Sequence, residues 1–396
     1  MSLPFCVAMP KQPPVRRLSI FEFFDGLTEP RVERTRVHPL MTVLAVALLT
    51  LITGGEGWED MEIFGEAKKE WLATFLDLRN GVPSAHTFRR VLSALNPKEF
   101  NLRFIAWVQA LSEGTCGKLI ALDGKTVRHS FDRATGKKAL HLVSAWIHEN
   151  KLTLGQMATE EKSNEITAIP ELLKLLDLDG ATITVDAMGC QRAIAEQIVE
   201  QGGDYVMGLK GNQGNAHAEV AAFFDDARAT AFRDTVHSFD ETTDGSEHGR
   251  LEVRRVWSCQ NLDWFADLSK WKGLRSIVMV ERERTVGDAP TSIERHYYWS
   301  SHAKDAATLG KMIRSHWGIE NSLHWCLDVG FREDDSRIRR DHGTENIALL
   351  RKIAMNLAKR ETSRKNGVRV KLHLAALSEP YLLKLLQAGL PDIQAK

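Results

Sequence analysis

Two short apolar segments, each followed at once by an aspartate, constrain the fold of this chain more than any other feature. Leu119–Leu122 leads into Asp123-Gly124, and Thr182–Val185 leads into Asp186. Apolar runs of this length that end in polar or turn residues predict buried strands. Because functional groups of α/β folds gather beyond the carboxyl ends of their strands, we expect both aspartates at one edge of a sheet.

The segments around these aspartates alternate between strand and helix patterns. Residues 192–201 have a helical pattern that stops at Gly202-Gly203, and Tyr205–Leu209 has the pattern of a strand. A strand, a helix and a strand within so few residues form a βαβ unit, which requires parallel pairing within a mixed sheet. Further strands are expected at 139–147 and 152–157, and a further helix at 171–178. The predicted fold class is α/β.

The remaining pattern divides the chain into segments of different character. Residues 1–20 are rich in proline and basic residues, which indicates a flexible arm, and 21–115 show the apolar spacing of packed helices, which predicts an all-α N-terminal domain. The α/β domain is expected over 116–365, with a β-rich insertion at about 211–305 that includes a hairpin turn at Gly287-Asp288. Residues 366–396 are predicted as a C-terminal helical tail.

One helix of the N-terminal region carries adjacent arginines after a break in the pattern. Gly81–Ser84 interrupts the chain, and Ala85–Val91 begins a helix that contains Arg89 and Arg90. A helix-turn-helix DNA reader would have this pattern. A solvated basic face of an all-α domain explains it as well, and the sequence leaves both interpretations open.

Composition excludes several classes of protein. The chain has 52 basic and 52 acidic residues, so any nucleic-acid site must be a local concentration of charge. Its five cysteines are scattered singly, without the paired spacing of zinc or disulfide frameworks. The most apolar stretch, Leu40–Thr53, is shorter than the roughly 20 residues of a membrane-spanning helix, and we expect a buried helix there. These features predict a cytoplasmic protein without a membrane partner.

A third acid, Glu320, lies on a predicted helix at 306–329. At 100° per residue its face of the helix is largely apolar and aromatic. The other residues of that face are Ile313, His316, Trp317, His324 and Leu327. A carboxylate buried there needs a partner, which could be one of the two histidines. A metal ion shared with Asp123 and Asp186 is the alternative, because Mg²⁺ prefers a few carboxylate oxygens.

Six short motifs resemble those of the H-repeat-associated insertion-sequence transposases, a DDE-type family. They are Ala121–Thr126, Thr184–Met188, Leu209–Gln213, His248–Arg250, Ile319–Trp325 and Asp328–Asp334. The motifs stand in the family's order, and the resemblance extends over most of the chain from Phe21 to about Arg360.

The resemblance implies a ribonuclease-H-like catalytic domain with a mixed sheet, flanking helices and a β-rich insertion. It implies that Asp123, Asp186 and Glu320 form a DDE triad that holds two Mg²⁺ or Mn²⁺ ions. The implied function is that of a bacterial insertion-sequence transposase, which acts at the nucleoid on terminal inverted repeats and target DNA. Because two DNA ends must be brought together, a homodimer is expected in the synaptic complex.

The residues around Glu320 depart from the wider group of DDE transposases with a β insertion. That group carries the signature Tyr-x-x-Arg-x-x-x-Glu-x-x-x-x-x-x-Lys. Its four positions are occupied here by Ile313, His316, Glu320 and Leu327. Arg314 or His316 is therefore a candidate for the role of the phosphate-binding arginine, and His324 for that of the lysine.

Other basic residues are candidate DNA contacts. They are Lys125, Lys210, Arg250, Arg254, Arg255 and, after the glutamate helix, Arg332, Arg337, Arg339 and Arg340. Cations at these places would neutralise phosphates, although a solvated surface explains each of them equally. Trp257 and Trp299 are explained either by packing within the insertion or by stacking on an unpaired base.

Two alternatives to a transposase remain open from the sequence. A ribonuclease-H-like nuclease without strand transfer would use the same three acids, and an inactive DNA-binding transposase remnant would use none of them. A nucleotide-binding loop is not expected at Gly124–Thr126, because Leu119 stands where a Walker A loop has its first glycine.

Overall fold

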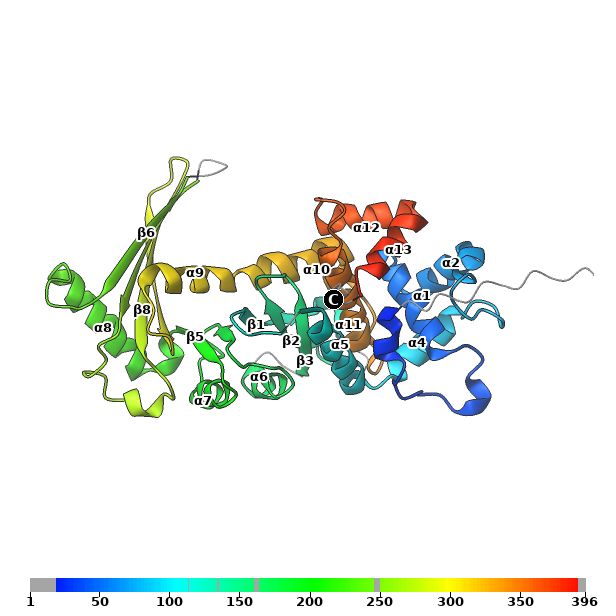
Figure 1. Ribbon diagram of the computed structural model, residues 1–396, viewed down its shortest axis with the longest axis horizontal. Coiled ribbons are helices and arrows are strands. Elements are labelled where there is room, and N and C mark those ends of the chain that lie inside the picture. Colours follow the sequence, from blue (N-terminus) through cyan, green and yellow to red (C-terminus); the bar gives the residue numbers. More distant parts are fainter. Residues whose placement is uncertain (1–18, 113, 134, 160–163, 246–249, 391–396) are drawn as a thin grey trace, which may run out of the picture.

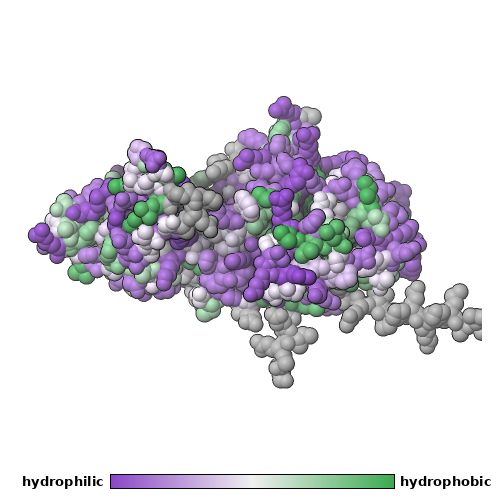
Figure 2. All heavy atoms as spheres, turned by 90° about the horizontal axis from the view of Figure 1, so that it is seen from above, coloured by the Kyte–Doolittle hydropathy of each residue, from purple (hydrophilic) through white to green (hydrophobic). Residues whose placement is uncertain are grey.

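The chain folds into an elongated molecule, with helices at one end and long strands at the other (Figure 1). The computed structural model describes residues 19–112, 114–133, 135–159, 164–245 and 250–390. Seen from above, the surface is mostly hydrophilic, with apolar side chains in small patches (Figure 2). Residues 1–18 of the predicted arm lie outside the described residues, whereas Ile20 is fully buried in a short 3-10 helix, η1 (Ser19–Phe24).

Five short strands form the part of the sheet that carries the two aspartates. They are β1 (Leu119–Thr126), β2 (His141–Ile147), β3 (Thr153–Thr159), β4 (Thr182–Val185) and β5 (Asp204–Leu209). β2 pairs antiparallel with β1 and β3, whereas β1, β4 and β5 pair in parallel. Helix α6 (Glu165–Leu173) precedes β4, and α7 (Arg192–Glu200) connects β4 to β5. The predicted mixed α/β sheet and its βαβ unit are confirmed.

Two of these elements differ from their predicted bounds. Strand β1 continues through Asp123, because β2 still pairs with it after the parallel pairing with β4 has stopped at Leu122. Helix α6 begins at residue 165 rather than 171 and contains Pro170. Burial of Ile169 and Leu172 outweighs the helix-breaking tendency of that proline.

The β-rich insertion continues the same sheet. It contributes η5 (Gly211–Gln213), α8 (Asn215–Ala229), β6 (Ser238–Asp244), β7 (Arg250–Cys259), η6 (Leu268–Lys270), β8 (Ser276–Val286) and β9 (Ser292–Ser300). Because β9 pairs antiparallel with β5, the nine strands have the order β3-β2-β1-β4-β5-β9-β8-β7-β6. The predicted turn at Gly287-Asp288 joins β8 to β9, with a φ of 53° at Gly287. Helix α8 was expected only as a polar stretch.

The two tryptophans of the insertion pack against other aromatic residues. Trp299 is fully buried, with its ring centroid 4.4 Å from that of Trp271, and its indole N–H donates to Cys190 Sγ at 2.9 Å. Trp257 stacks on Phe232 with 5.5 Å between ring centroids. Packing is therefore confirmed, and the alternative of base stacking is wrong for Trp299. The four described cysteines are free thiols, and Cys6 lies outside the described residues.

Helices from both ends of the chain share one core with the sheet. They are η2 (Glu33–Thr35), α1 (Leu40–Ile52), α2 (Trp58–Ala67), α3 (Lys69–Leu72), α4 (Ala85–Ala94), α5 (Pro97–Ser112), α11 (Gly343–Arg360), α12 (Val368–Leu377) and α13 (Glu379–Gln387). Twelve of the thirteen residues of α1 are buried, which confirms the predicted buried helix. None of the helices in the described part of the chain could span a membrane. Helix α11 packs against α1, α4 and α5, and one apolar cluster extends from Ile20 to Leu386, across the predicted domain boundaries.

Two asparagines cover the outer edge of β3, the first strand of the sheet. Asn356 of α11 accepts a hydrogen bond from the backbone N–H of Thr153 and donates one to its carbonyl oxygen, both at 2.9 Å. Asn101 of α5 accepts from the backbone N–H of Gln156 at 3.2 Å. These side chains take the place of a missing neighbour strand. They join the helical end of the molecule to the sheet.

Replacing Asn356 with Ala should lower the free energy of unfolding by about 2–4 kcal/mol, because it leaves two backbone groups of the buried Thr153 without partners at about 1–3 kcal/mol each. Urea unfolding measures this change. The exposed Asn215 at the start of α8 is the control, and its replacement with Ala should change the value by less than about 0.5 kcal/mol. An unchanged urea midpoint for Asn356→Ala would contradict the role given to this residue.

Candidate active site

Parallel pairing of β1 with β4 brings the two predicted aspartates together. The last parallel pair is Leu122 with Val185, so Asp123 and Asp186 are the next residues on neighbouring strands. Asp186 is exposed, and its Oδ1 accepts hydrogen bonds from the backbone N–H groups of Met188 at 2.9 Å and Gly189 at 3.2 Å. These bonds fix the carboxylate in the turn that follows β4.

A long helical segment carries the third acid across the sheet. It consists of α9 (Ala306–His316), the π-helical segment η7 (Glu320–His324) and α10 (Trp325–Phe331), followed by the 3-10 helix η8 (Glu333–Asp335). Helix α9 contacts β1, β4 and β5. It covers one face of this part of the sheet, and α6 and α7 cover the other (Figure 1). His316 at its end lies 2.9 Å from the hydroxyl of Thr184, measured from Nδ1 to Oγ1.

The predicted burial of Glu320 on an apolar helix face is wrong. Glu320 is exposed, Trp317 is 52% exposed, and Ile319 and Leu323 are the buried residues of this stretch. The π-helical turn that begins at Glu320 has more than 3.6 residues, so the face extrapolated at 100° per residue is rotated. A single π turn inside a helix frequently marks a functional site.

The charges of Asp186 and Glu320 act on Asp123, so the three predicted acids lie in one electrostatic environment. Asp123 has a side chain that is only 20% exposed. Its pKa is raised to about 7, chiefly by burial and in addition by the negative charges of Asp186, Glu320 and Glu165, against the hydrogen bond from the backbone N–H of Gly124. No lysine or arginine in the described residues forms an ion pair with any of the three predicted acids. The site is thus an uncompensated acidic cluster.

Glu165, at the start of α6, is a fourth carboxylate that the sequence pattern did not predict. It is buried and lies 2.6 Å from Nε2 of His141, whose Nδ1 lies 2.8 Å from the hydroxyl of Thr126. A Cβ atom at Gly124 would clash with both Glu165 and His141. The glycine after Asp123 is therefore required by this close approach, and it was the one signal in the sequence that a group packs there.

The two candidate histidines are not cations in this structure. Burial lowers the pKa of His316 to about 4 and that of His324 to about 3, so both rings are neutral near pH 7. Nδ1 of His324 lies 3.4 Å from Oδ2 of Asp123. His316 can therefore position Thr184 by its hydrogen bond, but neither ring supplies the fixed positive charge of the arginine or lysine in the wider group.

Lys125 is held by carboxylates of the segment that follows Glu320. Its Nζ lies 2.7 Å from Asp328, 2.9 Å from Asp334 and 3.1 Å from Glu333, and its side chain is 11% exposed. Burial alone would lower the pKa of Lys125, but these carboxylates outweigh it and raise the pKa. Because Lys125 follows Asp123 by two residues, its ion pairs tie β1 to α10 and η8.

The other predicted DNA contacts lie in different parts of the molecule. Lys210 is exposed at the end of β5, and Arg314 on α9 is 56% exposed. Arg254 on β7 is paired with Glu252 at 2.6 Å. Arg90 is exposed on α4, where Arg89 lies 3.1 Å from His86. The side chain of Arg250 lies outside the described residues. All of these contacts remain predictions.

The carboxylates of the acidic cluster suit an open site for a divalent metal ion. No group of three His, Cys, Asp or Glu side chains within the described ranges encloses a metal ion by itself. Mg²⁺ does not need such a cage, because it keeps waters and commonly binds through one or two carboxylates and substrate phosphates. Exposed Asp186 and Glu320 beside the partly buried Asp123 are such an open ligand set, and a cation would relieve their repulsion.

Comparisons with known proteins agree with this geometry. The family model described as a transposase DDE domain matches residues 114–357, and the model described as DDE_Tnp_1-associated matches residues 21–108. A putative transposase of Escherichia coli O157:H7, YncI, is 39% identical over 371 residues, which cover 93% of this chain and 94% of that protein.

Two further relatives come from Escherichia coli K12. The H repeat-associated putative transposase YhhI is 39% identical over 353 residues, 88% of this chain and 92% of its own length. A protein described as the inactive transposase YbfQ is 42% identical over 57 residues, 14% of this chain and 68% of its own length. With both family models and these relatives matched along its length, the chain belongs to the DDE transposases, whose catalytic domain is ribonuclease-H-like, and within them to the H-repeat-associated family.

Proposed function

We propose that this chain is an active insertion-sequence transposase that cuts DNA at terminal inverted repeats and joins the freed strand to target DNA. In this proposal Asp123, Asp186 and Glu320 hold two Mg²⁺ or Mn²⁺ ions. The observation that carries it is the convergence of these carboxylates from two parallel strands and a helix. Burial and the neighbouring negative charges raise the pKa of Asp123, and a cation site would explain why this carboxylate is kept there.

The side chains of this site would position the metal ions and the DNA without themselves forming covalent bonds to the DNA. Bound divalent ions would activate the attacking oxygen and stabilise the leaving one. Water attacks the phosphorus first, and the 3′ oxygen leaves and takes up a proton. The resulting 3′ hydroxyl then attacks a phosphodiester of the target, where one P–O bond forms as another breaks. His324, which lies beside Asp123, would help to position that carboxylate, and no covalent enzyme intermediate is needed.

The partners follow from the same reaction. Each element has two ends, and each cut needs its own set of three acids. We therefore propose that two copies of the chain hold two inverted repeats in a synaptic complex, acting on DNA at the bacterial nucleoid. A relative described as inactive shows why activity must be measured directly.

Asp123→Asn, Asp186→Asn and Glu320→Gln should each abolish Mg²⁺-dependent cleavage of a duplex that carries the inverted repeat bordering this reading frame, because each removes a charged oxygen ligand. A gel assay for the cut strand measures this loss. Glu171→Gln is the matched control, since Glu171 lies on the surface of α6 paired with Lys174, and it should keep full activity. Cleavage that survives Asp123→Asn would refute the assignment.

A second assay separates the transposase from its alternatives. Given a pre-cleaved end with a free 3′ hydroxyl and a supercoiled target plasmid, a transposase yields joined product. A ribonuclease-H-like nuclease cuts without joining. An inactive remnant binds the repeat but neither cuts nor joins, and Mg²⁺ or Mn²⁺ leaves its melting temperature unchanged.

Asp123→Asn should also stabilise the metal-free protein at neutral and higher pH. The folded-state pKa of Asp123 is about 7 against a usual 3.8, so wild-type stability falls as the pH rises from about 4 to 7, where the unfolded chain ionises first. Asn cannot ionise, and its advantage should be on the order of 2–4 kcal/mol at pH 8 and less than about half of that at pH 5. Urea unfolding in EDTA measures both values. Equal stability of the two proteins at pH 8 would contradict the acidic cluster.

Lys125→Met should destabilise the fold without changing the salt dependence of DNA binding. The change leaves three carboxylates around an apolar side chain, and loss of one partner of a buried ion pair costs about 3–5 kcal/mol. Lys210→Met is the comparison variant, because Lys210 is exposed. Its stability should stay unchanged, and the salt slope of its DNA binding should fall by about 1 if Lys210 contacts a phosphate. Normal stability with a reduced slope for Lys125→Met would restore this lysine as a DNA contact.

A further inference from the structure

Four arginines on the insertion strands already have their charges neutralised by glutamates. The pairs are Arg254 with Glu252, Arg255 with Glu241 and Glu283, Arg282 with Glu294, and Arg295 with Glu281. A guanidinium held by a carboxylate gains little from a phosphate, because it must give up the first partner. These four arginines are therefore weak candidates for contacts with DNA.

A second group of cations lies on two segments that meet beside the acids. Residues 128–138 contain four basic residues against one acid, Asp132, and residues 337–340 contain three arginines and no acid. The helices η3 (Arg128–Ser130) and η8 bring the two segments into contact. We call this group the arginine surface. It consists of Arg128, Arg133, Lys137, Arg337, Arg339 and Arg340.

Neutral groups, rather than carboxylates, hold several of these cations. Lys137 Nζ donates to two backbone carbonyls at 2.7 and 3.1 Å. Arg339 Nε donates to the carbonyl of His129 at 3.1 Å, and its guanidinium lies 5.2 Å from the ring centroid of Phe131. Arg337 is exposed and forms no ion pair within the ranges that the structure describes. These contacts position the side chains without cancelling their charge.

Two members of the surface have acidic neighbours, but both pairs are open to solvent. Arg128 lies 3.1 Å from Asp334 and is 77% exposed, and Arg340 lies 3.3 Å from Asp341 and is 70% exposed. Exposed pairs of this kind contribute only about 0–1 kcal/mol. A phosphate can therefore compete for both arginines.

The arginine surface lies between the acidic cluster and the N-terminal helices. Arg128 follows Asp123 by five residues, at most about 17 Å at roughly 3.3 Å per residue. It lines a pocket of about 360 Å³ together with Lys125 and His324. On the other side, His342 donates its backbone N–H to the carbonyl of Ser93 in α4 at 3.2 Å.

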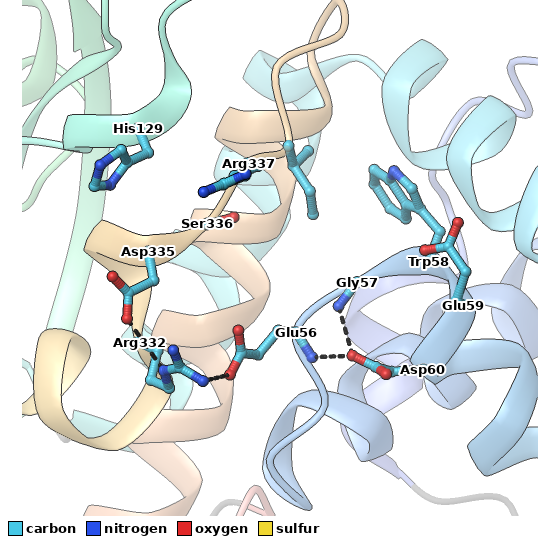
Figure 3. A pocket seen from close by; sticks show the side chains of 11 residues that line it. Glu56, Gly57, Trp58, Glu59, Asp60, His129, Arg332, Asp335, Ser336 and Arg337 are labelled. Atoms are coloured by element: carbon cyan, nitrogen blue, oxygen red, sulfur yellow. Dashed lines mark hydrogen bonds and ion pairs between the residues drawn. The ribbon is translucent and has the colours of Figure 1, made fainter.

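A larger pocket of about 530 Å³ marks the border with α2 (Figure 3). His129 and Arg337 lie on one side of it, and the segment Glu56–Asp60 at the start of α2 lies on the other (Figure 3). Arg332 bridges Glu56 at 2.7 Å and Asp335 at 3.1 Å, so its charge is neutralised. Glu56, Glu59 and Asp60 on the α2 side of the pocket repel phosphates. A DNA backbone would therefore pass along the opposite side, where Arg337 lies.

We propose that the arginine surface binds the phosphate backbone of the transposon-end duplex between the N-terminal helices and the bond that is cut at Asp123. This inference rests on the proposed function and names the part of the substrate that this surface holds. At 3.4 Å per base pair, the surface begins within about five base pairs of the scissile phosphate. Its contacts fix the register of the DNA end without reading its sequence.

A charge-removal variant tests the inference in the full-length protein. The variant combines Arg133→Gln, Arg337→Gln and Arg340→Gln, all at exposed positions. The matched control combines Arg364→Gln, Lys365→Gln and Arg369→Gln, which remove the same charge from exposed residues near the start of α12. Binding of a labelled duplex with the inverted repeat at its end, and of an unrelated duplex of equal length, is measured in Ca²⁺ at several salt concentrations.

The surface variant should bind both duplexes at least about tenfold more weakly near physiological salt, with a salt slope reduced by about 2 to 3, because each lost phosphate contact contributes about 0.9. The control should bind like the wild type. Equal losses in both variants would show an effect of net charge only, and unchanged binding by the surface variant would likewise overturn the inference.

Cleavage by the wild type separates this inference from the proposed function. If the wild type does not cut the repeat in Mg²⁺ while the surface variant still binds DNA more weakly, the proposed function fails and the arginine surface stands. If the wild type cuts and the surface variant binds and cuts as well as the control, the arginine surface fails and the proposed function stands.

Discussion

Parallel hydrogen bonding between β1 and β4 is the constraint on which the site depends. It stops at the pair Leu122 and Val185, so that two aspartates emerge together at the sheet edge. Sheet geometry, rather than attraction, holds these charges close, and burial together with the neighbouring negative charges raises the pKa of Asp123. A site that repels itself in the free protein is preorganised for a cation, because its carboxylates need not move to meet one. Interactions elsewhere in the fold must therefore offset the free-energy cost of holding these carboxylates close together.

Ion pairs and buried amides supply part of that stability. Lys125, two residues beyond Asp123, fastens the strand to the segment that carries Glu320, and its three carboxylate partners leave it little freedom. Asn356 and Asn101 fasten the far edge of the sheet to α11 and α5. The positions of the acids thus depend on contacts between distant segments: Lys125 and Glu333 are 208 residues apart in the chain, and Thr153 and Asn356 are 203 apart. A change in the helical end of the molecule can reach the site by altering how β1, α9 and α10 meet.

The sequence predicted the two aspartates well because each follows a short apolar strand that is visible in the local pattern, and the βαβ unit predicted parallel pairing. It did not predict the exposure of Glu320, because a π turn cannot be seen in an apolar periodicity of 3.6. The pairing of β5 with β9 was also hidden: Leu209 meets Tyr297 across an insertion of nearly ninety residues, and nothing local specifies that register. Glu165 was missed because its effect on Asp123 arises from packing under Gly124.

The basic residues show most clearly why charge must be judged in three dimensions. Lys125 and Arg254 look like DNA contacts in the sequence, yet Lys125 is paired with Glu333 from a distant segment and Arg254 with Glu252 on its own strand. Arg337 and Arg339 look no different in the sequence, yet the first has no acidic partner among the described residues and the second is held by a carbonyl and a ring. The chain has 52 basic and 52 acidic residues, so its total charges balance. Its electrostatic surface potential therefore depends on which of these residues form ion pairs with one another. DNA would be attracted to the cations that no carboxylate neutralises. These cations lie beside the acids that the DNA backbone would have to reach.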